Sequence, residues 1–553
     1  MSNEPSGPAS GGAAGAPDQR SDQPSAQPSS WAPFRHRVFA ILWTATVISN
    51  TGTWMQNAAA GWLMTGLDPN PLVVALVQVA TTLPMFLFGI PAGALADILD
   101  RRKLLVAVQI ALTAIVTGFS LLVWLDRITP ASLLGFTFLM GAGAALIAPA
   151  WQAIVPQLVP RDELPPAVTA NSVGINISRA IGPALAGLLI GALGIAAPFW
   201  VNAITNMVVI AALIWWRPQD AKTQRLPPER FGSAMLTGLR HARRNPHLRA
   251  TIIRATGFFV FASAYWALLP LVARNQVQGG PALYGILLGA IGGSAVIGAL
   301  VLPLIKERLG ANGLAAAGTI GTAAALVLFG LARNPATALA ASFCAGISWI
   351  AVLATINVSA QVGLPAWVRG RGLALFVTVM FGAMSLGSMA WGQVAAHIGL
   401  PATHIIAAAG LVFALLALRR WKLQTGAGVN FDPSLHWPAP VLAQDIDRDR
   451  GPVLVTVEYR IDPNNRAAFL DALFALSDQR RRDGAFEWHV FEDAAEPGRF
   501  VETFLLTSWL EHMRQHERVT HEGRELQERA QAFHVGQTPP GVSHLIAAEI
   551  GER

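Results

Sequence analysis

The sequence predicts an all-α polytopic membrane protein that carries a small α+β domain at its C-terminal end. Charged residues make up only 13% of the 553 residues, against about 25% in soluble proteins. Between residues 37 and 418, apolar segments recur that are long enough to cross the roughly 30 Å hydrocarbon core of a bilayer. From residue 452 onward, in contrast, the chain is rich in charge and contains no segment of that length.

Twelve segments have the length and apolar composition of membrane helices. They are residues 37–66, 71–96, 104–125, 131–156, 166–194, 197–216, 250–273, 281–305, 311–332, 336–362, 367–396 and 400–418. A loop with clustered arginines, residues 217–249, follows the sixth segment. It divides the membrane part into two sets of six, which span residues 31–216 and 250–425.

The stretches outside the membrane part differ in composition. Residues 1–30 are mainly Pro, Ser, Gly, Ala and Gln without an apolar block, which predicts a disordered cytoplasmic tail rather than a signal peptide. Residues 426–451 are expected to form a linker, and residues 452–553 are expected to form a soluble domain.

Basic residues gather in every second loop, which predicts the orientation of the chain. One side carries Arg35, Arg37, Arg101, Arg102, Lys103, Arg161, the loop 217–249, Lys306, Arg308, Arg369, Arg371, Arg419, Arg420 and Lys422. The other side carries only Arg127, Arg274 and Arg333. Because basic loops stay in the cytoplasm, both termini are expected to be cytoplasmic in a bacterial inner membrane.

An internal repeat supports the division into two sets of six. The tripeptide Gly-Ala-Leu at Gly93 recurs at Gly298, and the stretch 157–160 before Arg161 resembles the stretch 361–365 before Arg369. The two offsets are nearly equal, which is expected of two parallel halves.

The loop after the second segment has a recognisable pattern of Gly93, Asp97, Arg101 and Arg102. It resembles the motif between the second and third helices of major facilitator superfamily transporters, although Ile98 stands where that family has a basic residue. The resemblance implies that these residues form a gate, in which Asp97 meets the start of the eleventh helix on the cytoplasmic side. The simpler alternative is a basic loop that only fixes the topology.

Three stretches, 49–56, 93–102 and 179–187, together resemble the transmembrane secretion effectors, a branch that includes the enterobactin exporters. The resemblance implies a major facilitator fold and the export of a small organic substrate, a siderophore, drug or metabolite, by alternating access. It also implies coupling to an ion gradient, with the proton as the expected ion. Import by the same fold is an alternative.

Two polar helix faces are candidates for the substrate cavity. Asn50, Thr53 and Asn57 lie on one face of the first segment, where they line a cavity or else join neighbouring helices by hydrogen bonds. Asn176 and Arg179 share a face of the fifth segment. Arg179 lies roughly 20 Å inside the segment, where a charge is costly and hence usually functional.

Other classes of function lack sequence support. The basic residues lie at helix ends rather than in a nucleic-acid-binding patch, and no Gly-rich phosphate loop or catalytic Ser or Cys signature is present. No cofactor or metal is expected, and the single cysteine, Cys344, excludes an intrachain disulfide. No Asp or Glu lies well inside a predicted segment, so the proton path is left open.

The soluble domain is expected to have the order βαββαβ of the ferredoxin-like fold. Alternating residues predict strands at 453–460, 485–493, 499–507 and 542–549, with one helix ending near Arg482 and a second beginning at Ser508. The stretch 502–517 resembles antibiotic-biosynthesis monooxygenases, which implies pairing into a homodimer. The alternative function is therefore a membrane-anchored enzyme or sensor. His512 and His516 are expected to be surface residues, because no third metal ligand is evident.

Overall fold

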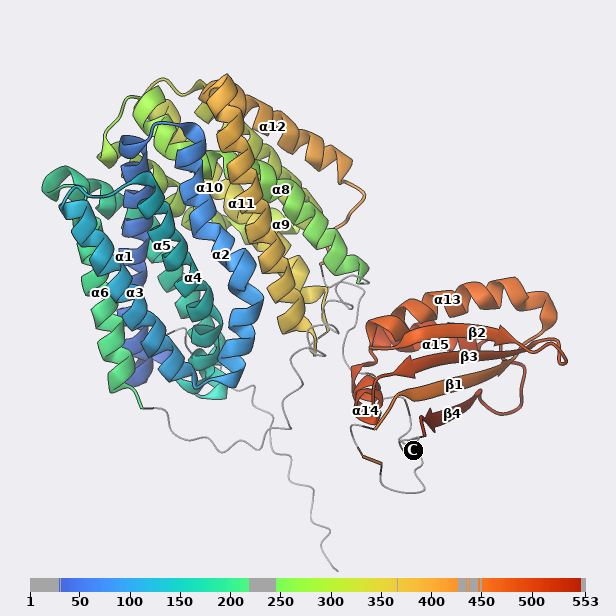
Figure 1. The fold of residues 1–553 in the computed structure, drawn as a ribbon. Coiled ribbons are helices and arrows are strands. Elements are labelled where there is room, and N and C mark those ends of the chain that lie inside the picture. The colour runs from blue at the N-terminus through green and yellow to red at the C-terminus, as the bar shows by residue number, and fades with distance from the viewer. Residues whose placement is uncertain are drawn as a thin grey trace, which may run out of the picture.

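The computed structural model describes residues 29, 31–217, 245–365, 367–425, 434, 437, 446–447 and 450–548. Nearly all of the predicted tail 1–30 lies outside these residues, as do most of the predicted central loop 217–249 and of the predicted linker 426–451. Within them, the chain forms a bundle of long helices and a separate four-stranded sheet (Figure 1).

The long helices begin and end within a few residues of the predicted segments. They are α1 (Arg37–Leu67), α2 (Pro71–Ile98), α3 (Arg101–Trp124), α4 (Pro130–Ile154), α5 (Leu164–Leu193), α6 (Ala197–Trp215), α8 (Pro246–Leu271), α9 (Pro281–Leu331), α10 (Pro335–Val362), α11 (Arg369–Ile398) and α12 (Leu400–Ala417). Ten helices in the described part of the chain are long and apolar enough to cross a membrane. The chain is therefore a multi-pass membrane protein.

One predicted loop is helical instead. The charges of Arg101 to Lys103 form the first turn of α3, because the Asp100 carboxylate accepts a hydrogen bond from the Lys103 backbone N–H at 2.8 Å and caps the helix. The predicted break between residues 305 and 311 is confirmed at Gly310, where two helical stretches of α9 meet at a non-helical φ of 66° and ψ of 175°, although Lys306 is still helical. Glycine adopts this positive φ without strain.

Small residues let the first six helices approach the later ones closely. A Cβ atom added to Gly285 of α9 would lie 2.5 Å from the Pro183 carbonyl oxygen of α5, and one added to Gly187 would lie 2.7 Å from the Pro281 carbonyl oxygen. Backbones in such contact are typical of helix packing in lipid, where dispersion rather than water exclusion holds helices together. The α5–α9 contact is therefore one of the main seams between the halves of the bundle.

A second seam joins α2 to α11, which lie side by side in Figure 1. The Thr82 and Ser385 hydroxyl groups are hydrogen-bonded at 2.7 Å across it. Gly392 packs so closely against α2 that an added Cβ would lie 2.5 Å from the Ala75 methyl group. The two seams place α2 and α5 of the first half against α11 and α9 of the second.

Arg274 joins the two halves of the bundle at the end where α1 finishes, near Leu67. Arg274, which follows α8, donates a hydrogen bond from Nη1 to the Thr65 Oγ1 at 2.9 Å, and its guanidinium lies 5.6 Å from the centre of the Trp62 ring. Trp62 also stacks on Tyr284 of α9, with 5.9 Å between ring centres. We call this the Arg274 end of the bundle, and the opposite end, where α3 begins, the Arg101 end.

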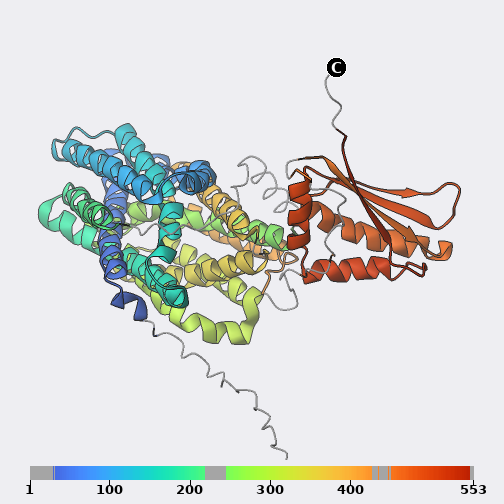
Figure 2. The ribbon, with the colours of Figure 1, turned by 90° about the horizontal axis from the view of Figure 1, so that it is seen from below.

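The C-terminal sheet has the strand order β2–β3–β1–β4, with all neighbours antiparallel. Its elements are β1 (Val453–Arg460), α13 (Arg466–Arg482), β2 (Phe486–Glu492), β3 (Arg499–Leu506), α14 (Trp509–Arg518), α15 (His521–Gln531) and β4 (Gly541–Ile546). The helices cover one face of the sheet (Figure 2). The predicted pairing with a second copy stays a prediction.

The sequence analysis was wrong on two details of this domain. The helix that begins after Ser508 ends at Arg518, and a separate helix, α15, follows it. His512 is not a surface residue, because only 2% of it is exposed. The first error arises because the helix stops at Val519 and the Thr520 side chain caps a new one by accepting a hydrogen bond from the Gly523 backbone N–H.

A buried ion pair fixes the interior of this domain. Glu502 of β3 is fully buried, accepts a hydrogen bond from the Trp488 indole N–H at 2.9 Å, and lies 3.5 Å from the Arg480 guanidinium. The Tyr459 hydroxyl donates to the same carboxylate at 3.2 Å. The charge of Glu502 is thus paired and hydrogen-bonded, as a buried carboxylate requires.

The sheet domain contacts the bundle through α14. The Arg518 guanidinium lies 4.4 Å from the centre of the Trp367 ring, two residues before α11 begins. Arg518 is itself held by Glu511, with an N–O distance of 2.7 Å. The last turn of α14 therefore lies on the segment that starts α11, at the Arg101 end of the bundle.

Candidate functional site

A cavity of about 310 Å³ lies inside the first six helices. Residues of α1, α2, α3, α4, α5 and α6 line it, and none of its lining residues belongs to the second half of the described chain. Its volume is at the lower end of the range of about 300–1,000 Å³ that is common for small-molecule sites.

The α1 wall of this cavity is polar although the helix is otherwise apolar. Thr46, Ser49, Asn50, Thr53 and Asn57 all line the cavity. This is the face that the spacing along the sequence predicted. Thr53 also contacts its own helix, since its hydroxyl donates to the Ser49 carbonyl at 3.1 Å, so the same face serves both the cavity and local hydrogen bonding.

The opposite walls add polar residues that the sequence analysis missed. Gln109 of α3, Thr137 of α4 and Asn206 of α6 line the cavity, and Asn206 accepts a hydrogen bond from Ser49 at 2.8 Å. A polar side chain within an apolar segment is the sequence signal for such residues. The direction in which Gln109 and Asn206 face, however, depends on how the helices pack.

Arg179 of α5 lies at the rim of this site. Its guanidinium carbon is 5.0 Å from the centre of the Trp54 ring, and Trp54 lines the cavity. The backbone of Arg179 lies at the seam between the halves, because a Cβ added to Gly292 of α9 would lie 3.1 Å from the Arg179 carbonyl oxygen. Among the described residues, the buried Nε atom of Arg179 has no hydrogen-bond partner. The one deeply placed cation of α5 thus connects the cavity wall to the seam between the halves.

Asn176 has a different environment from Arg179. Its side-chain amide donates to the Ser172 carbonyl of its own helix at 2.9 Å, and it is not among the residues that line the cavity. Of the predicted cavity residues, the structure therefore brings Asn50, Thr53 and Asn57 together, with Arg179 beside them.

The gate motif lies at the Arg101 end. Arg102 donates from Nε to the Leu213 carbonyl at 2.8 Å and from Nη2 to the Ile214 carbonyl at 2.7 Å, so it caps the end of α6. Arg101 donates to the Ala153 carbonyl of α4 at 3.4 Å. A Cβ added to Gly93 would meet nothing within 4 Å. The side chain of Asp97, in the last turn of α2, lies outside the described part of the structure.

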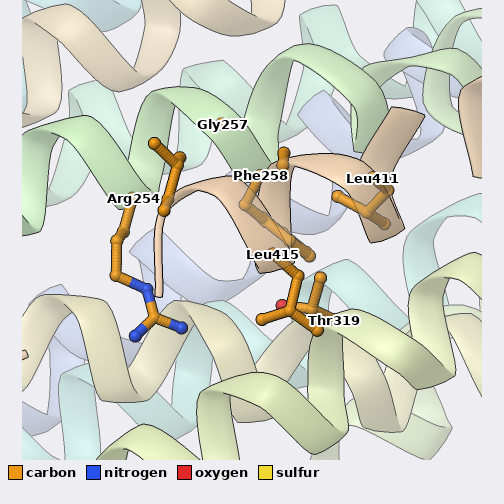
Figure 3. Close-up of a pocket in the computed structure, with 8 residues that line it drawn as sticks. Arg254, Gly257, Phe258, Thr319, Leu411 and Leu415 are labelled. Carbon is orange, nitrogen blue, oxygen red and sulfur yellow. The ribbon is translucent and has the colours of Figure 1, made fainter. Parts of the chain in front are cut away.

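A second gap, between α8, α9 and α12, is far smaller. It has a volume of about 20 Å³ and lies among Arg254, Phe258, Thr319 and Leu411 (Figure 3). The Arg254 Nη1 donates to the Asn312 Oδ1 at 2.9 Å. This gap has room for about one water molecule, which excludes it as a site for an organic substrate.

Comparison with known families decides the class of protein. A family model described as "Transmembrane secretion effector" matches residues 28–551, which include the sheet domain as well as the bundle. The chain belongs to the transmembrane secretion effector family. The resemblance seen in the sequence motifs is therefore confirmed at the level of the family.

Several curated relatives of this chain are named for the compounds they carry. This chain is 28% identical to the staphyloferrin A transporter of Staphylococcus aureus (strain NCTC 8325 / PS 47). The match covers 47% of this chain and 65% of that protein. This chain is 27% identical over 54% of its length to the enterobactin exporter EntS of Escherichia coli O1:K1 / APEC, matching 70% of that protein. A macrolide efflux protein of Streptococcus pyogenes is 22% identical, with 48% of this chain and 66% of that protein covered. The chain thus spans less than two thirds of the first of these relatives.

Solved structures confirm the fold of the membrane part. A POT family transporter in complex with a thioalcohol-conjugated peptide superposes with a TM-score of 0.59 at 13% identity. The match covers 70% of this chain and 96% of that chain. A bacterial homologue of the human lysosomal transporter Spinster, in an inward-facing conformation, superposes with a TM-score of 0.57 at 15% identity. The match covers 70% of this chain and 98% of that chain. At this level of identity the likeness concerns the fold alone.

Proposed function

We propose that this chain is a secondary active exporter of a small organic molecule, of the siderophore or drug kind, in a bacterial inner membrane. The observation that carries the proposal is the cavity of about 310 Å³ with a polar wall on α1, inside a lipid-embedded bundle. Polar groups at that depth are costly unless they meet each other, water or a substrate. The relatives named for siderophores and macrolides support the same substrate class.

We infer that twelve helices cross the membrane, in two repeats of six. Besides the ten spans identified by composition, α1 has 31 residues, and α9, with 51 residues and a break at Gly310, has the length of two spans. The excess of basic residues at the Arg101 end supports a cytoplasmic position for that end and for both termini. In this arrangement the sheet domain, which we infer to be ferredoxin-like from its strand order, lies in the cytoplasm.

The contacts at the Arg274 end support an inward-open conformation. Arg274, Trp62 and Tyr284 join the halves there, on the side that the proposed orientation places outside the cell. At the other end, Gly93 has open space around it. Export by alternating access then requires the Arg101 end to close, with α2 approaching the start of α11. The proton stays the expected coupling ion.

We propose that Asp97 holds the closed state by meeting the positive N-terminal end of α11, which begins at Arg369. Asp97→Asn is expected to favour the inward-open state, and a loss of about 1.4 kcal/mol would change the ratio of states tenfold. Asp100→Asn is the matched control, because asparagine caps a helix as well as aspartate does. The measurement is thiol labelling of a cysteine placed at Asn50, in a chain whose Cys344 is replaced.

Faster labelling in Asp97→Asn than in Asp100→Asn supports the gate. Equal labelling of the two variants and the parent chain would contradict it and leave the loop as a topology signal only. The transport proposal itself is tested by comparing the small molecules inside and outside cells that lack this chain with those of the parent strain.

A further inference from the structure

Three histidines that are distant in the sequence meet at the edge of the C-terminal sheet. His512 and His516 lie one turn apart on α14, and His544 lies on β4, an edge strand of the sheet. One ring nitrogen of each histidine lies within 4.8 Å of those of the other two. His544 reaches the cluster because β4 pairs with β1, where His544 stands opposite the buried Val455 and therefore on the helix-covered face.

The spacing of the ring nitrogens suits a metal ion. The Nε2 atoms of His512 and His516 are 3.3 Å apart. Two imidazole nitrogens bound to one tetrahedral zinc ion at about 2.0–2.1 Å are themselves about 3.3 Å apart. His544 packs against His512 with 4.6 Å between ring centres, so a small shift of its ring completes a set of three ligands.

A hydrogen bond between His512 and His516 is the simpler account of the short distance, but it does not account for His544. A ring nitrogen of His544 lies within 4.8 Å of those of the other two histidines, so three imidazoles meet at one point beside His512, of which only 2% is exposed.

Aromatic side chains surround the cluster and hold the rings in place. Trp509 packs against His512 with 5.1 Å between ring centres and against His544 with 6.3 Å, while Trp437 packs edge-on against His516 at 5.0 Å. Such a shell restricts water and fixes ring orientation, which tunes a metal site.

We propose that His512, His516 and His544 bind a divalent first-row transition metal, with zinc as the reference ion. Three imidazoles without a thiolate suit zinc, cobalt, nickel or copper rather than magnesium or calcium. Three protein ligands leave a fourth position of a tetrahedral ion for water or a small molecule. The site lies on α14, whose last turn carries the Arg518 that contacts Trp367 before α11.

The test uses the full chain, purified without a histidine tag, stripped with a chelator and titrated with zinc. The parent chain is expected to bind one zinc ion, and cobalt in its place is expected to give the visible absorption of a tetrahedral site. His544→Gln and His516→Gln are each expected to weaken zinc binding at least about tenfold. His521→Ala, in the same domain but outside the cluster, is expected to leave affinity unchanged.

His512 is buried, so a substitution there can unfold the domain, and His544→Gln on the edge strand is the decisive variant. Circular dichroism establishes that each variant is folded, and zinc is expected to raise the unfolding midpoint of the parent more than that of His544→Gln. Absence of zinc binding by the stripped parent at micromolar concentrations would overturn the proposal. So would equal affinities of His544→Gln, His516→Gln and the parent.

Discussion

Gly285→Val is expected to reduce substrate release by cells at least about tenfold, because it forces apart the seam between α5 and α9. The added Cβ would lie 2.5 Å from the Pro183 carbonyl oxygen and 3.0 Å from the Gly187 Cα, both backbone atoms that cannot turn away. Overpacking of this kind costs about 1–3 kcal/mol, and a cost of 1.4 kcal/mol changes a conformational equilibrium about tenfold.

Gly293→Val is the matched control for that substitution. Gly293 lies in the same helix, and a Cβ added there would meet nothing within 4 Å. Both variants carry the same change in helix propensity, so the difference between them reports the seam alone. Release rates are compared at equal amounts of protein in the membrane, together with the thermal unfolding midpoints of the purified chains. Equal release by the two variants would show that the α5–α9 contact plays no part in transport.

Arg179→Gln is expected to abolish most of the release while leaving membrane insertion intact. The substitution removes the cation that lies 5.0 Å from the Trp54 ring at the cavity wall, an interaction worth about 2 kcal/mol or more where it is desolvated. Arg179→Lys is expected to retain part of the activity, because lysine keeps the charge but lacks the flat guanidinium that stacks on an indole.

Asn176→Ala provides the control on the same helix. Its amide bonds only the Ser172 carbonyl of its own helix among the contacts described, so the expected effect on release is small. The measurement is the initial rate of release, normalised to the protein found in the membrane. If Arg179→Gln releases the compound as fast as Asn176→Ala does, the deep cation serves folding rather than transport.

The sequence predicted the helix boundaries well because hydropathy and charge change sharply there. It failed at Arg101, where the charges are the first turn of a helix capped by Asp100, and it placed Lys306 in a loop although the helix break comes only at Gly310. Charge alone does not distinguish a loop from an exposed helical turn. Local capping and the backbone freedom of one glycine decide these positions.

The candidate site was predictable on one helix and hidden on the others. The periodicity of Asn50, Thr53 and Asn57 is a property of α1 alone and needs no knowledge of its neighbours. That Asn206 faces Ser49, in contrast, depends on the packing of α6 against α1. His544 joins the histidine pair of α14 only through the register of β4 on β1. This register cannot be read from the sequence alone.

Export of a small organic molecule is tested most directly by metabolite comparison of a strain that lacks this chain with its parent. The account predicts that at least one compound accumulates in the cells of the deletion strain and is depleted from its medium. It also predicts that a chain ending at Thr425 restores some release, because the cavity lies wholly within the membrane part. A compound that instead stays in the medium of the deletion strain while the parent removes it would show import and contradict the account.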